Sequence, residues 1–328
     1  MLSVAMSSGA ERLTGNGGLP FIRVSFDASH CDVYLWGATL TSWVHRGSEQ
    51  LYLSGLAVFD GVKAIRGGIP LVFPQFGQPD LAMAQHGFAR TKVWTFLGHS
   101  ADDHQATALF SLQHDEHTLS LWPHSFHLLY EVRVSPEGLV TTLHVLNTGD
   151  QPCSFQALLH TYLRVAEVSS VTVRGLRGLH FLDKLDAGGG SPQETRDQVR
   201  IEGEVDRVYT GSTQPVSLQD STGLRSLTSS AVVTEDTHLG GLLAGEEGQV
   251  EAGGVAALLR HLHSAPGGSE QEVDVVLWNA WEARSRALPD LDDDAYLGYV
   301  CLEPGLVVRT PCLLPAQRLA LSQQIRFL

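Results

Sequence analysis

Apolar and polar residues alternate along most of this chain with a period close to two. This period is typical of half-buried β-strands, because successive side chains of a strand point to opposite faces. The alternating runs are rich in Val, Thr, Tyr, Phe and Trp and are separated by Gly, Pro, Asp and Ser. We predict strands over residues 21–26, 32–45, 91–99, 107–115, 127–135, 139–149, 154–165, 169–176, 273–281, 296–308 and 321–328.

Helical periodicity is weak throughout. The stretch VAALLRHLHS, residues 255–264, fits either a short helix or a strand. Strands at hairpin spacing without intervening helices predict an all-β fold, a single large antiparallel β-sandwich. We expect residues 1–19 to be a flexible polar lead-in and residues 20–328 to form the domain. The glycine-rich stretch 239–270 is expected to be a surface loop or insertion.

Composition narrows the possible partners and location. The 328 residues suffice for one large sandwich, and the formal net charge of −14 argues against nucleic acid and anionic membranes as partners. The four cysteines are widely scattered, which indicates reduced thiols in a cytoplasmic setting. The sequence shows neither an apolar run of the ~20 residues that a membrane span needs nor a typical secretory signal. We therefore predict a cytoplasmic protein without membrane or nucleic-acid partners.

One stretch, AIRGGIPLVFPQFG at residues 64–77, is unusual for a strand. Gly67 and Gly68 followed by Ile69-Pro70 cannot form a helix interior and make a poor central strand, but they let the backbone approach a ligand closely. Arg66 beside this turn carries a rigid fork of donors suited to carboxylate or phosphate, and Arg90 in QHGFAR resembles it. Taken alone, Arg66 is more simply explained as a surface arginine beside a strand bend, and the same ambiguity holds for Arg90.

Two further residues suggest acid–base chemistry. His160 lies within the apolar pattern LLHTYLRV, where an unpaired imidazole would cost free energy, so it either has a buried partner or faces a polar pocket. Glu303 follows the apolar run YVCL and precedes Pro-Gly. Burial raises the pKa of a carboxyl group, which suits proton transfer. The other closely spaced histidine pairs lack a clear third ligand, so no metal site is predicted.

Six segments appear in a characteristic order: IRGGIPLVFPQFG, QHGFAR, LHTYLRV, GEVDRVY, WNAWEA and CLEPG. This ordered set resembles the hexose-6-phosphate mutarotases within the aldose 1-epimerase superfamily, from about residue 20 to residue 327. The resemblance implies a galactose mutarotase-like β-sandwich. It also implies an enzyme that interconverts the anomers of glucose 6-phosphate, a small-molecule sugar phosphate, with no cofactor and no metal. A monomer is the simplest expectation for its assembly.

The resemblance also implies roles for individual residues. Glu303 would be the general base that takes the proton from the C1 hydroxyl, and His160 the general acid that protonates the ring oxygen. The C1–O5 bond would open to an aldehyde, and reclosure after rotation about C1–C2 would give the other anomer. His86 and Asp206 would hold sugar hydroxyls or the ring oxygen.

The remaining expected substrate contacts come from the same motifs. Arg66 and Arg90 would bind the phosphate through charge-assisted hydrogen bonds. The other residues expected to contact the substrate, several of them as apolar walls for the sugar ring, are Gln75, Phe76, Phe88 and Trp281.

Two departures from the family pattern stand out. The chain has Trp278-Asn279-Ala280-Trp281 where the family usually has Trp-Asn-Pro-Trp, which should loosen that turn, and its glycine-rich segment is longer than usual. Two other functions stay open: a mutarotase for neutral sugars, in which the arginines would be incidental, and a non-catalytic carbohydrate-binding sandwich. The presence of both arginines and of the His–Glu pair favours the sugar-phosphate epimerase.

Overall fold

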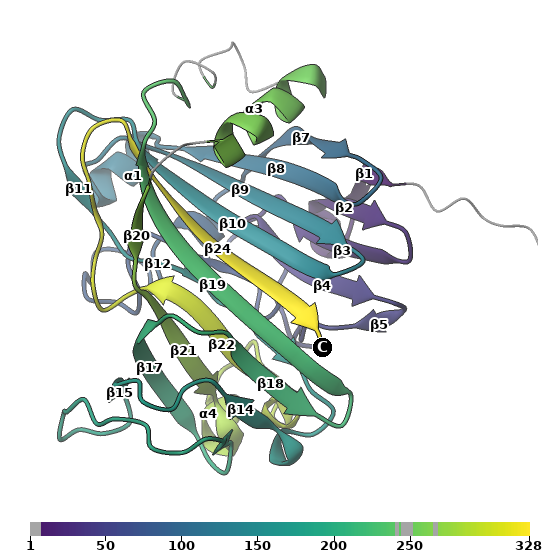
Figure 1. Cartoon of the computed structure of the whole chain (residues 1–328), viewed down its shortest axis with the longest axis vertical. Helices are drawn as coiled ribbons and strands as arrows, with labels where there is room; N and C mark the ends of the chain where they lie inside the picture. The colour runs from purple at the N-terminus through teal and green to yellow at the C-terminus, as the bar shows by residue number, and fades with distance from the viewer. Residues whose placement is uncertain (1–7, 240–242, 244–251, 265–267) are drawn as a thin grey trace, which may run out of the picture.

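The computed structural model of the chain describes residues 8–239, 243, 252–264 and 268–328, and it has the layered β architecture expected from the sequence (Figure 1). A large ten-stranded sheet crosses the molecule, and a five-stranded N-terminal sheet and a seven-stranded sheet pack against it. Neighbouring strands are antiparallel in all three sheets. The prediction of a large antiparallel β-sandwich is therefore confirmed.

The ten-stranded sheet carries the longest strands. In spatial order, its strands are β16 (Val199–Arg200), β14 (Thr172–Arg174), β18 (Val216–Asp220), β19 (Gly223–Glu235), β24 (Gln317–Phe327), β10 (Gly138–Asn147), β9 (Phe126–Ser135), β8 (Ala106–Gln113) and β7 (Thr95–Ala101), and β20 (Ser269–Gln271) pairs with β19.

The other sheets form the second layer. The N-terminal sheet consists of β1 (Gly9–Thr14), β2 (Pro20–Phe26), β3 (Ser29–Tyr34), β4 (Thr39–His45) and β5 (Ser48–Glu49). The seven-stranded sheet runs in the order β15 (Phe181–Asp183), β17 (Val205–Ser212), β21 (Val273–Asn279), β22 (Tyr299–Leu306), β12 (Ala157–Leu159) and β6 (Leu71–Val72), with β13 (Tyr162–Arg164) also pairing with β22. A small separate ladder joins β11 (Cys153–Ser154) to β23 (Cys312–Leu313).

Helices are short and few among the described residues. They are α1 (Glu116–Leu121), α3 (Ala252–Ser264) and α4 (Trp281–Ala287), with 3₁₀ turns η1 (Asn16–Gly18), η2 (Ala89–Thr91), η3 (Val168–Ser170) and η5 (Ala295–Leu297). In the part of the chain that is described, no helix has the length and apolar character needed to span a membrane.

The seven-stranded sheet buries both of its faces, which is important for the site. Along β21, Val275 and Leu277 point into the core between the layers. The intervening residues Val276 and Trp278 point to the opposite face, where they join smaller apolar clusters. This alternation follows from the period of two along a strand. The outer face of the sheet therefore carries apolar side chains, and loops and α4 lie over it.

Several predicted strands are divided in the structure. Residues 32–45 form two strands, β3 and β4, because Gly37 and Ala38 adopt positive φ angles of 71° and 45° and turn the chain back. Residues 154–165 form three short strands, β11, β12 and β13, rather than one. The long strands β17 and β19 have no counterpart among the strands predicted from periodicity, and β19 is rich in Ser and Thr on its exposed positions.

The expected lead-in is partly ordered. Gly9–Thr14 form β1, which pairs with β2 along its whole length, so the expectation of a flexible segment is wrong for these residues. The first seven residues lie outside the described part of the chain.

The glycine-rich stretch contains a helix where a loop or insertion was expected. Residues 252–264 form α3, and the spacing of Val255, Leu258, Leu259 and Leu262 explains why. These residues recur at i, i+3, i+4 and i+7, so they make one apolar stripe on a helix. The stripe packs on leucines of the large sheet: Leu97, Leu109, Leu129 and Leu146. Residues 240–242, 244–251 and 265–267 lie outside the described residues.

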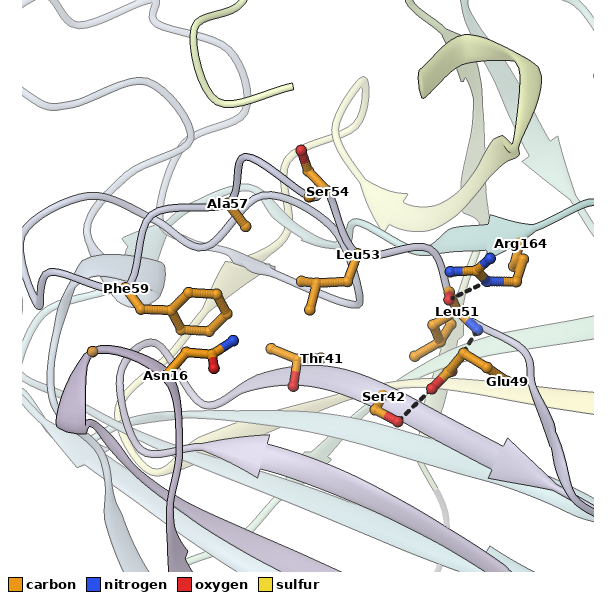
Figure 2. A pocket seen from close by; sticks show the side chains of 12 residues that line it. Asn16, Thr41, Ser42, Glu49, Leu51, Leu53, Ser54, Ala57, Phe59 and Arg164 are labelled. Carbon is orange, nitrogen blue, oxygen red and sulfur yellow. Dashed lines mark hydrogen bonds between the residues drawn. The ribbon is translucent and has the colours of Figure 1, made fainter. Parts of the chain in front are cut away.

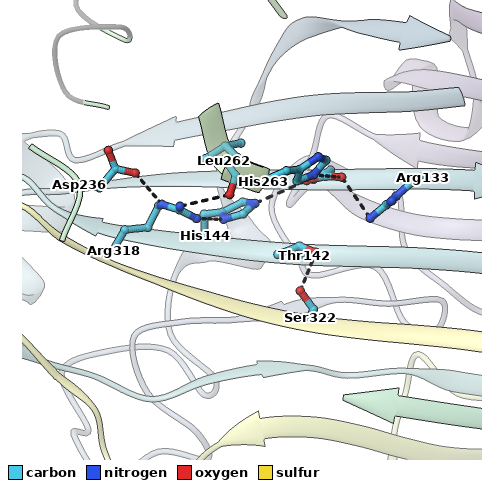
Figure 3. A network of polar contacts seen from close by, with 9 residues as sticks. Arg133, Thr142, His144, Asp236, Leu262, His263, Arg318 and Ser322 are labelled. Carbon is cyan, nitrogen blue, oxygen red and sulfur yellow. Dashed lines mark hydrogen bonds and ion pairs between the residues drawn. The ribbon is translucent and has the colours of Figure 1, made fainter. Parts of the chain in front are cut away.

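A buried polar network fastens α3 to the large sheet (Figure 3). Arg318 of β24 pairs with Asp236 at 2.8 Å and donates to Nδ1 of His144 at 2.8 Å and to the carbonyl oxygen of Leu262 in α3. His263 of α3 lies 3.0 Å from the buried Glu131 carboxylate. Arg318 and Asp236 are each about 2% exposed, so their charges depend on one another.

We predict that Arg318→Met lowers the free energy of unfolding by about 3–5 kcal/mol, because it removes the buried guanidinium from Asp236 and leaves His261 as the remaining basic partner of that carboxylate. Urea unfolding at pH 7 measures the change. Arg177→Met is the matched control, since it breaks the exposed Arg177–Asp197 pair and should leave the midpoint unchanged. Equal midpoints for the two variants would show that the network contributes nothing to stability.

Candidate active site

A cavity of about 300 Å³ opens on the outer face of the seven-stranded sheet. Its floor is formed by strands β21 and β22 and by the segment between β12 and β13, and its rim by loops and by α4. The lining residues are mostly polar and include seven charged side chains: Arg66, Arg90, Lys184, Glu204, Asp206, Arg284 and Glu303. Seven of the residues predicted from the motifs line it: Arg66, Phe76, His86, Arg90, His160, Asp206 and Glu303.

Strand register brings His160 and Glu303 together. Leu158 pairs with Gly305 on one side, and Tyr162 pairs with Cys301 on the other. The same register is kept across the interruption between β12 and β13, so His160 falls directly opposite Glu303. Their side chains lie on one face of the sheet, with His160 Nδ1 3.3 Å from Glu303 Oε1.

Burial sets the protonation of this pair. Glu303 is 1% exposed and His160 is 7% exposed. Burial, assisted by the neighbouring Asp206, raises the pKa of Glu303 well above its ordinary value. Burial, assisted by Arg90 and Arg66, lowers the pKa of His160 well below 6.5. Both shifts favour the neutral forms, the imidazole of His160 and the carboxyl group of Glu303.

Aromatic rings hold the imidazole in place. The His160 ring stacks on Tyr162 with centroids 4.8 Å apart, and it meets Trp278 edge-on at 5.9 Å. Trp278 is directly paired with Asp206 across β21 and β17. Lys184 lies 3.9 Å from the Asp206 carboxylate and 3.7 Å above the ring of Phe76. Burial raises the pKa of Asp206, while Lys184 opposes that shift.

Two glycines of the motifs allow segments of the backbone to pack closely beside the cavity. A Cβ on Gly68 would lie 2.1 Å from the Leu40 carbonyl oxygen, and one on Gly87 would lie 2.1 Å from that of Phe73. Both glycines have positive φ. Glycines in these motifs were expected to let the backbone approach a ligand. At Gly68 and Gly87 the backbone instead approaches a neighbouring segment of the chain. The result is that Arg66 and His86 are held at the cavity by tightly packed turns.

The two motif arginines have different surroundings. Arg66 donates to the Tyr162 hydroxyl at 3.3 Å and pairs with Asp290 at 3.1 Å, and these partners raise its pKa against the effect of burial. Arg90 donates to the Gln85 carbonyl oxygen at 2.8 Å. Burial and the neighbouring Arg66 lower the pKa of Arg90 to about 10. Arg90 therefore lies beside another cation, an arrangement that an anion between them would relieve.

His86 and Phe76 lie in the cavity wall, as predicted. His86 accepts a hydrogen bond from the Gly77 backbone at Nδ1, and its ring lies 5.3 Å from Phe76 and 5.7 Å from His160. Burial and the positive charge of Arg90 lower its pKa. A neutral His86 can offer its other ring nitrogen to a sugar hydroxyl.

Three predicted contacts are misplaced. Gln75 is buried behind the wall, where its amide bonds the backbone of Asp80, Met83 and Ala84 and so orders the turn before His86. Phe88 lies in the core against Phe73 and Phe126. Trp281 packs on Tyr296. None of these three residues is among those that line the cavity.

Other lining residues were not singled out from the sequence. Trp278 supplies the apolar wall that was expected of Trp281, and Lys184 and Arg284 add two cations. The alternation along β21 would have separated Trp278 from the core residues, but nothing in the sequence pattern around Lys184 marks it. The Ala280 backbone N–H donates to the Tyr299 hydroxyl at 3.2 Å, a hydrogen bond that proline could not make, so this turn remains tied to β22.

A second hollow, of about 680 Å³, lies between the N-terminal sheet and residues 51–59 (Figure 2). Its one carboxylate, Glu49, is fully engaged by Ser42 and by the backbone N–H groups of Trp43, Gln50 and Leu51. Arg164 at its edge donates to the Leu51 carbonyl oxygen. Among its described lining residues, this larger hollow offers no acid–base pair, in contrast to the smaller cavity.

Comparison with known proteins identifies the family. Residues 21–240 match the sequence profile of the aldose 1-epimerase family. The chain belongs to the aldose 1-epimerase family. It is therefore an isomerase of the kind that interconverts sugar anomers, which confirms the resemblance and the enzyme class predicted above.

Similar proteins cover nearly the same length. A protein from Cenchrus ciliaris named "Putative glucose-6-phosphate 1-epimerase" is 31% identical over 304 residues, covering 89% of this chain and 80% of its own. A protein of the same name from Escherichia coli K12 is 30% identical, covering 89% and 85%. The crystal structure of a "putative mutarotase" from Salmonella typhimurium is 25% identical, with a TM-score of 0.75 over 98% of this chain and 97% of its own.

The neutral resting state of the pair is directly testable. We predict that the His160 ring of the free protein is uncharged at pH 6, because burial and two arginines lower its pKa below 6.5. Imidazole nitrogen chemical shifts measured across pH, with His160 assigned by comparison with His160→Gln, report the charge. A titration midpoint at or above 6.5 would contradict the proposed electrostatics.

Proposed function

We propose that this epimerase interconverts the α and β anomers of a hexose 6-phosphate, with glucose 6-phosphate as the first candidate. The observation that carries the proposal is the direct 3.3 Å pairing of His160 with Glu303 at the floor of a cavity rimmed by four cationic side chains. The pairing suits acid–base catalysis on a sugar ring, and the cations suit an anionic substituent.

The proposed mechanism uses one proton held by the pair. The pair holds that proton either on Glu303, as carboxyl and imidazole, or on His160, as carboxylate and imidazolium. Substrate entering the cavity separates the two groups: the carboxylate form of Glu303 takes the C1 hydroxyl proton, and His160 gives its proton to the ring oxygen. The C1–O5 bond then breaks to give the aldehyde. Rotation about C1–C2 and the reverse transfers close the other anomer.

The energetics need only positioning and proton transfer. Mutarotation proceeds slowly in water, and general acid–base catalysis contributes roughly 10²–10⁴-fold. The stacked Tyr162 and the edge of Trp278 fix the plane of the His160 ring. Fixed geometry of this kind lowers the entropic cost of reaching the transition state. His86 and Asp206, also in the wall, would hold hydroxyls and so orient the ring between acid and base.

The cationic side chains at the rim of the cavity suit the binding of a phosphate group. Arg66 lies close enough to Arg90 to lower the pKa of Arg90. Lys184, which follows β15, and Arg284 of α4 add two further cations to the lining of the cavity. Arg66 presents a guanidinium already oriented by Tyr162 and Asp290, which reduces the side-chain entropy lost on binding. A cavity of about 300 Å³ is at the small end of ligand pockets, as suits a single sugar phosphate. The two relatives described above are each named "Putative glucose-6-phosphate 1-epimerase", which supports glucose 6-phosphate as the substrate.

The deciding experiment is anomer exchange measured by two-dimensional exchange NMR at catalytic protein concentration. Glucose 6-phosphate and glucose are compared side by side. Accelerated exchange of the phosphate alone supports the proposal. Equal or faster exchange of glucose would favour a neutral-sugar mutarotase, and exchange of neither would remove the catalytic role of His160 and Glu303 for these sugars.

Glu303→Gln should lower kcat for glucose 6-phosphate by at least about 10²-fold, because an amide cannot accept the C1 hydroxyl proton. Binding should persist, since the phosphate contacts are unchanged. Exchange NMR gives the rate, and calorimetric titration with glucose 6-phosphate gives the affinity. A variant with an undiminished rate would exclude Glu303 as the base.

Arg66→Ala should raise KM for glucose 6-phosphate about 10–100-fold, the range expected for loss of a charge-assisted hydrogen bond. Asp290→Asn should shift KM in the same direction but less, since Arg66 remains and loses only its anchor. KM for glucose is the control and should change little in both variants. Equal effects on the two sugars would refute a phosphate-binding role for Arg66.

A further inference from the structure

A third side chain, Cys301, lies beside the acid–base pair and has no part in the proposed reaction. Cys301 precedes Glu303 by two residues on β22, so both side chains lie on the cavity face of the sheet. Suitable ligand atoms of His160, Cys301 and Glu303 all lie within 4.8 Å of one another, and all three residues are buried. A nitrogen, a sulfur and a carboxylate oxygen thus lie close together, with His160 and Glu303 lining the cavity and Cys301 fully buried beside them.

The separation of the first two atoms matches zinc geometry. Tetrahedral zinc with Zn–N of about 2.0–2.1 Å and Zn–O of about 2.0–2.2 Å places its nitrogen and oxygen ligands about 3.3 Å apart. The observed distance from His160 Nδ1 to Glu303 Oε1 is 3.3 Å. The Cys301 sulfur would need to lie about 3.5 Å from each of them, given a Zn–S bond of about 2.3 Å. The three ligand atoms lie within 4.8 Å of one another, so a small movement of the Cys301 side chain would bring its sulfur to the distance that zinc requires.

The same atoms lack other partners. Nδ1 of His160 and both carboxylate oxygens of Glu303 are buried without a hydrogen bond from any residue in the described part of the chain. Buried polar atoms are normally satisfied, so three such atoms around one point mark a place where another group binds. The cavity side remains open for a fourth ligand, either water or a sugar oxygen.

We propose that His160, Cys301 and Glu303 form an inhibitory site for a thiophilic divalent cation such as Zn²⁺, which competes with the sugar substrate. Thiolate and imidazole ligands favour zinc and cobalt over magnesium and calcium. On binding, the Cys301 thiol and the Glu303 carboxyl group each release a proton to solvent, so that a thiolate, a carboxylate and the neutral His160 imidazole coordinate the ion. The ion is an inhibitor because it occupies the carboxylate that must accept the C1 hydroxyl proton, a consequence that rests on the proposed function.

Cobalt tests metal binding independently of activity. Co²⁺ added to the chelator-treated full-length protein should give the near-ultraviolet thiolate-to-cobalt charge-transfer band. Cys301→Ser should lose this band, and Cys312→Ser, which removes an exposed cysteine on β23, should keep it. If Cys301→Ser does not fold, Cys301→Ala takes its place. No band in the unmodified protein, or a band that survives loss of the Cys301 sulfur, would overturn the proposal.

Displacement by sugars locates the ion and separates the two proposals. Glucose 6-phosphate should abolish the cobalt band. Displacement by glucose but not by glucose 6-phosphate would support the metal site while refuting the proposed substrate. A band that persists with both sugars at high concentration would overturn a site in the catalytic cavity.

Zinc inhibition supplies the functional readout. Zn²⁺ should inhibit the epimerase competitively, and ethylenediaminetetraacetate should reverse the inhibition. Cys301→Ser should retain activity while its inhibition constant for Zn²⁺ rises by at least about 100-fold, since even outer-shell partners of a metal are worth about 10–100-fold in affinity. An unchanged inhibition constant in this variant would overturn the proposal.

Discussion

The site depends on one constraint: the pairing of β22 with its neighbours on both sides. Register with β12 and β13 places His160 opposite Glu303, and register with β21 places Val276 opposite Glu303 and Trp278 opposite Cys301. A shift by one residue would turn Glu303 into the core and move an apolar neighbour to the cavity. The geometry of the acid–base pair is thus set by backbone hydrogen bonds of a central strand and needs no dedicated hydrogen bond to either side chain. The imidazole of His160 and the carboxyl group of Glu303 therefore both remain available to a ligand.

The electrostatics of the cavity reverse those of the whole molecule. The chain carries a formal net charge of −14, yet four cationic side chains meet around one small opening. Asp290 and Asp206 compensate part of this charge by lying beside Arg66 and Lys184. Because the compensation is incomplete at Arg90, where burial and Arg66 lower the pKa to about 10, the local field still favours an anion. A low-dielectric floor below this field also explains why both members of the acid–base pair prefer to be neutral until the substrate arrives.

Local alternation was sufficient to predict the fold class, because it is a property of neighbouring residues, whereas the roles of the site residues were implied by the resemblance of short motifs to a known family. His160, Glu303, Arg66, Arg90, His86, Asp206 and Phe76 all reach the cavity or its wall. The misplaced contacts depend on how turns orient individual side chains. Gln75 has the polarity of a ligand contact, but the backbone of the following turn takes its hydrogen bonds, and Trp281 lies after a turn that points it toward Tyr296. Lys184 reaches the site only through the pairing of β15 with β17, a fact that no periodicity encodes.

The described helix of the glycine-rich stretch lies away from the candidate active site. This helix, α3, packs on leucines of β7 to β10 in the large sheet, whereas the cavity lies on the outer face of the seven-stranded sheet. None of the cavity residues identified in the described part of the chain comes from α3. The Arg318–Asp236 pair and the His263–Glu131 contact instead bind the helix to strands whose other faces form the core. The described helix therefore acts on the stability of the large sheet and not on the lining of the cavity.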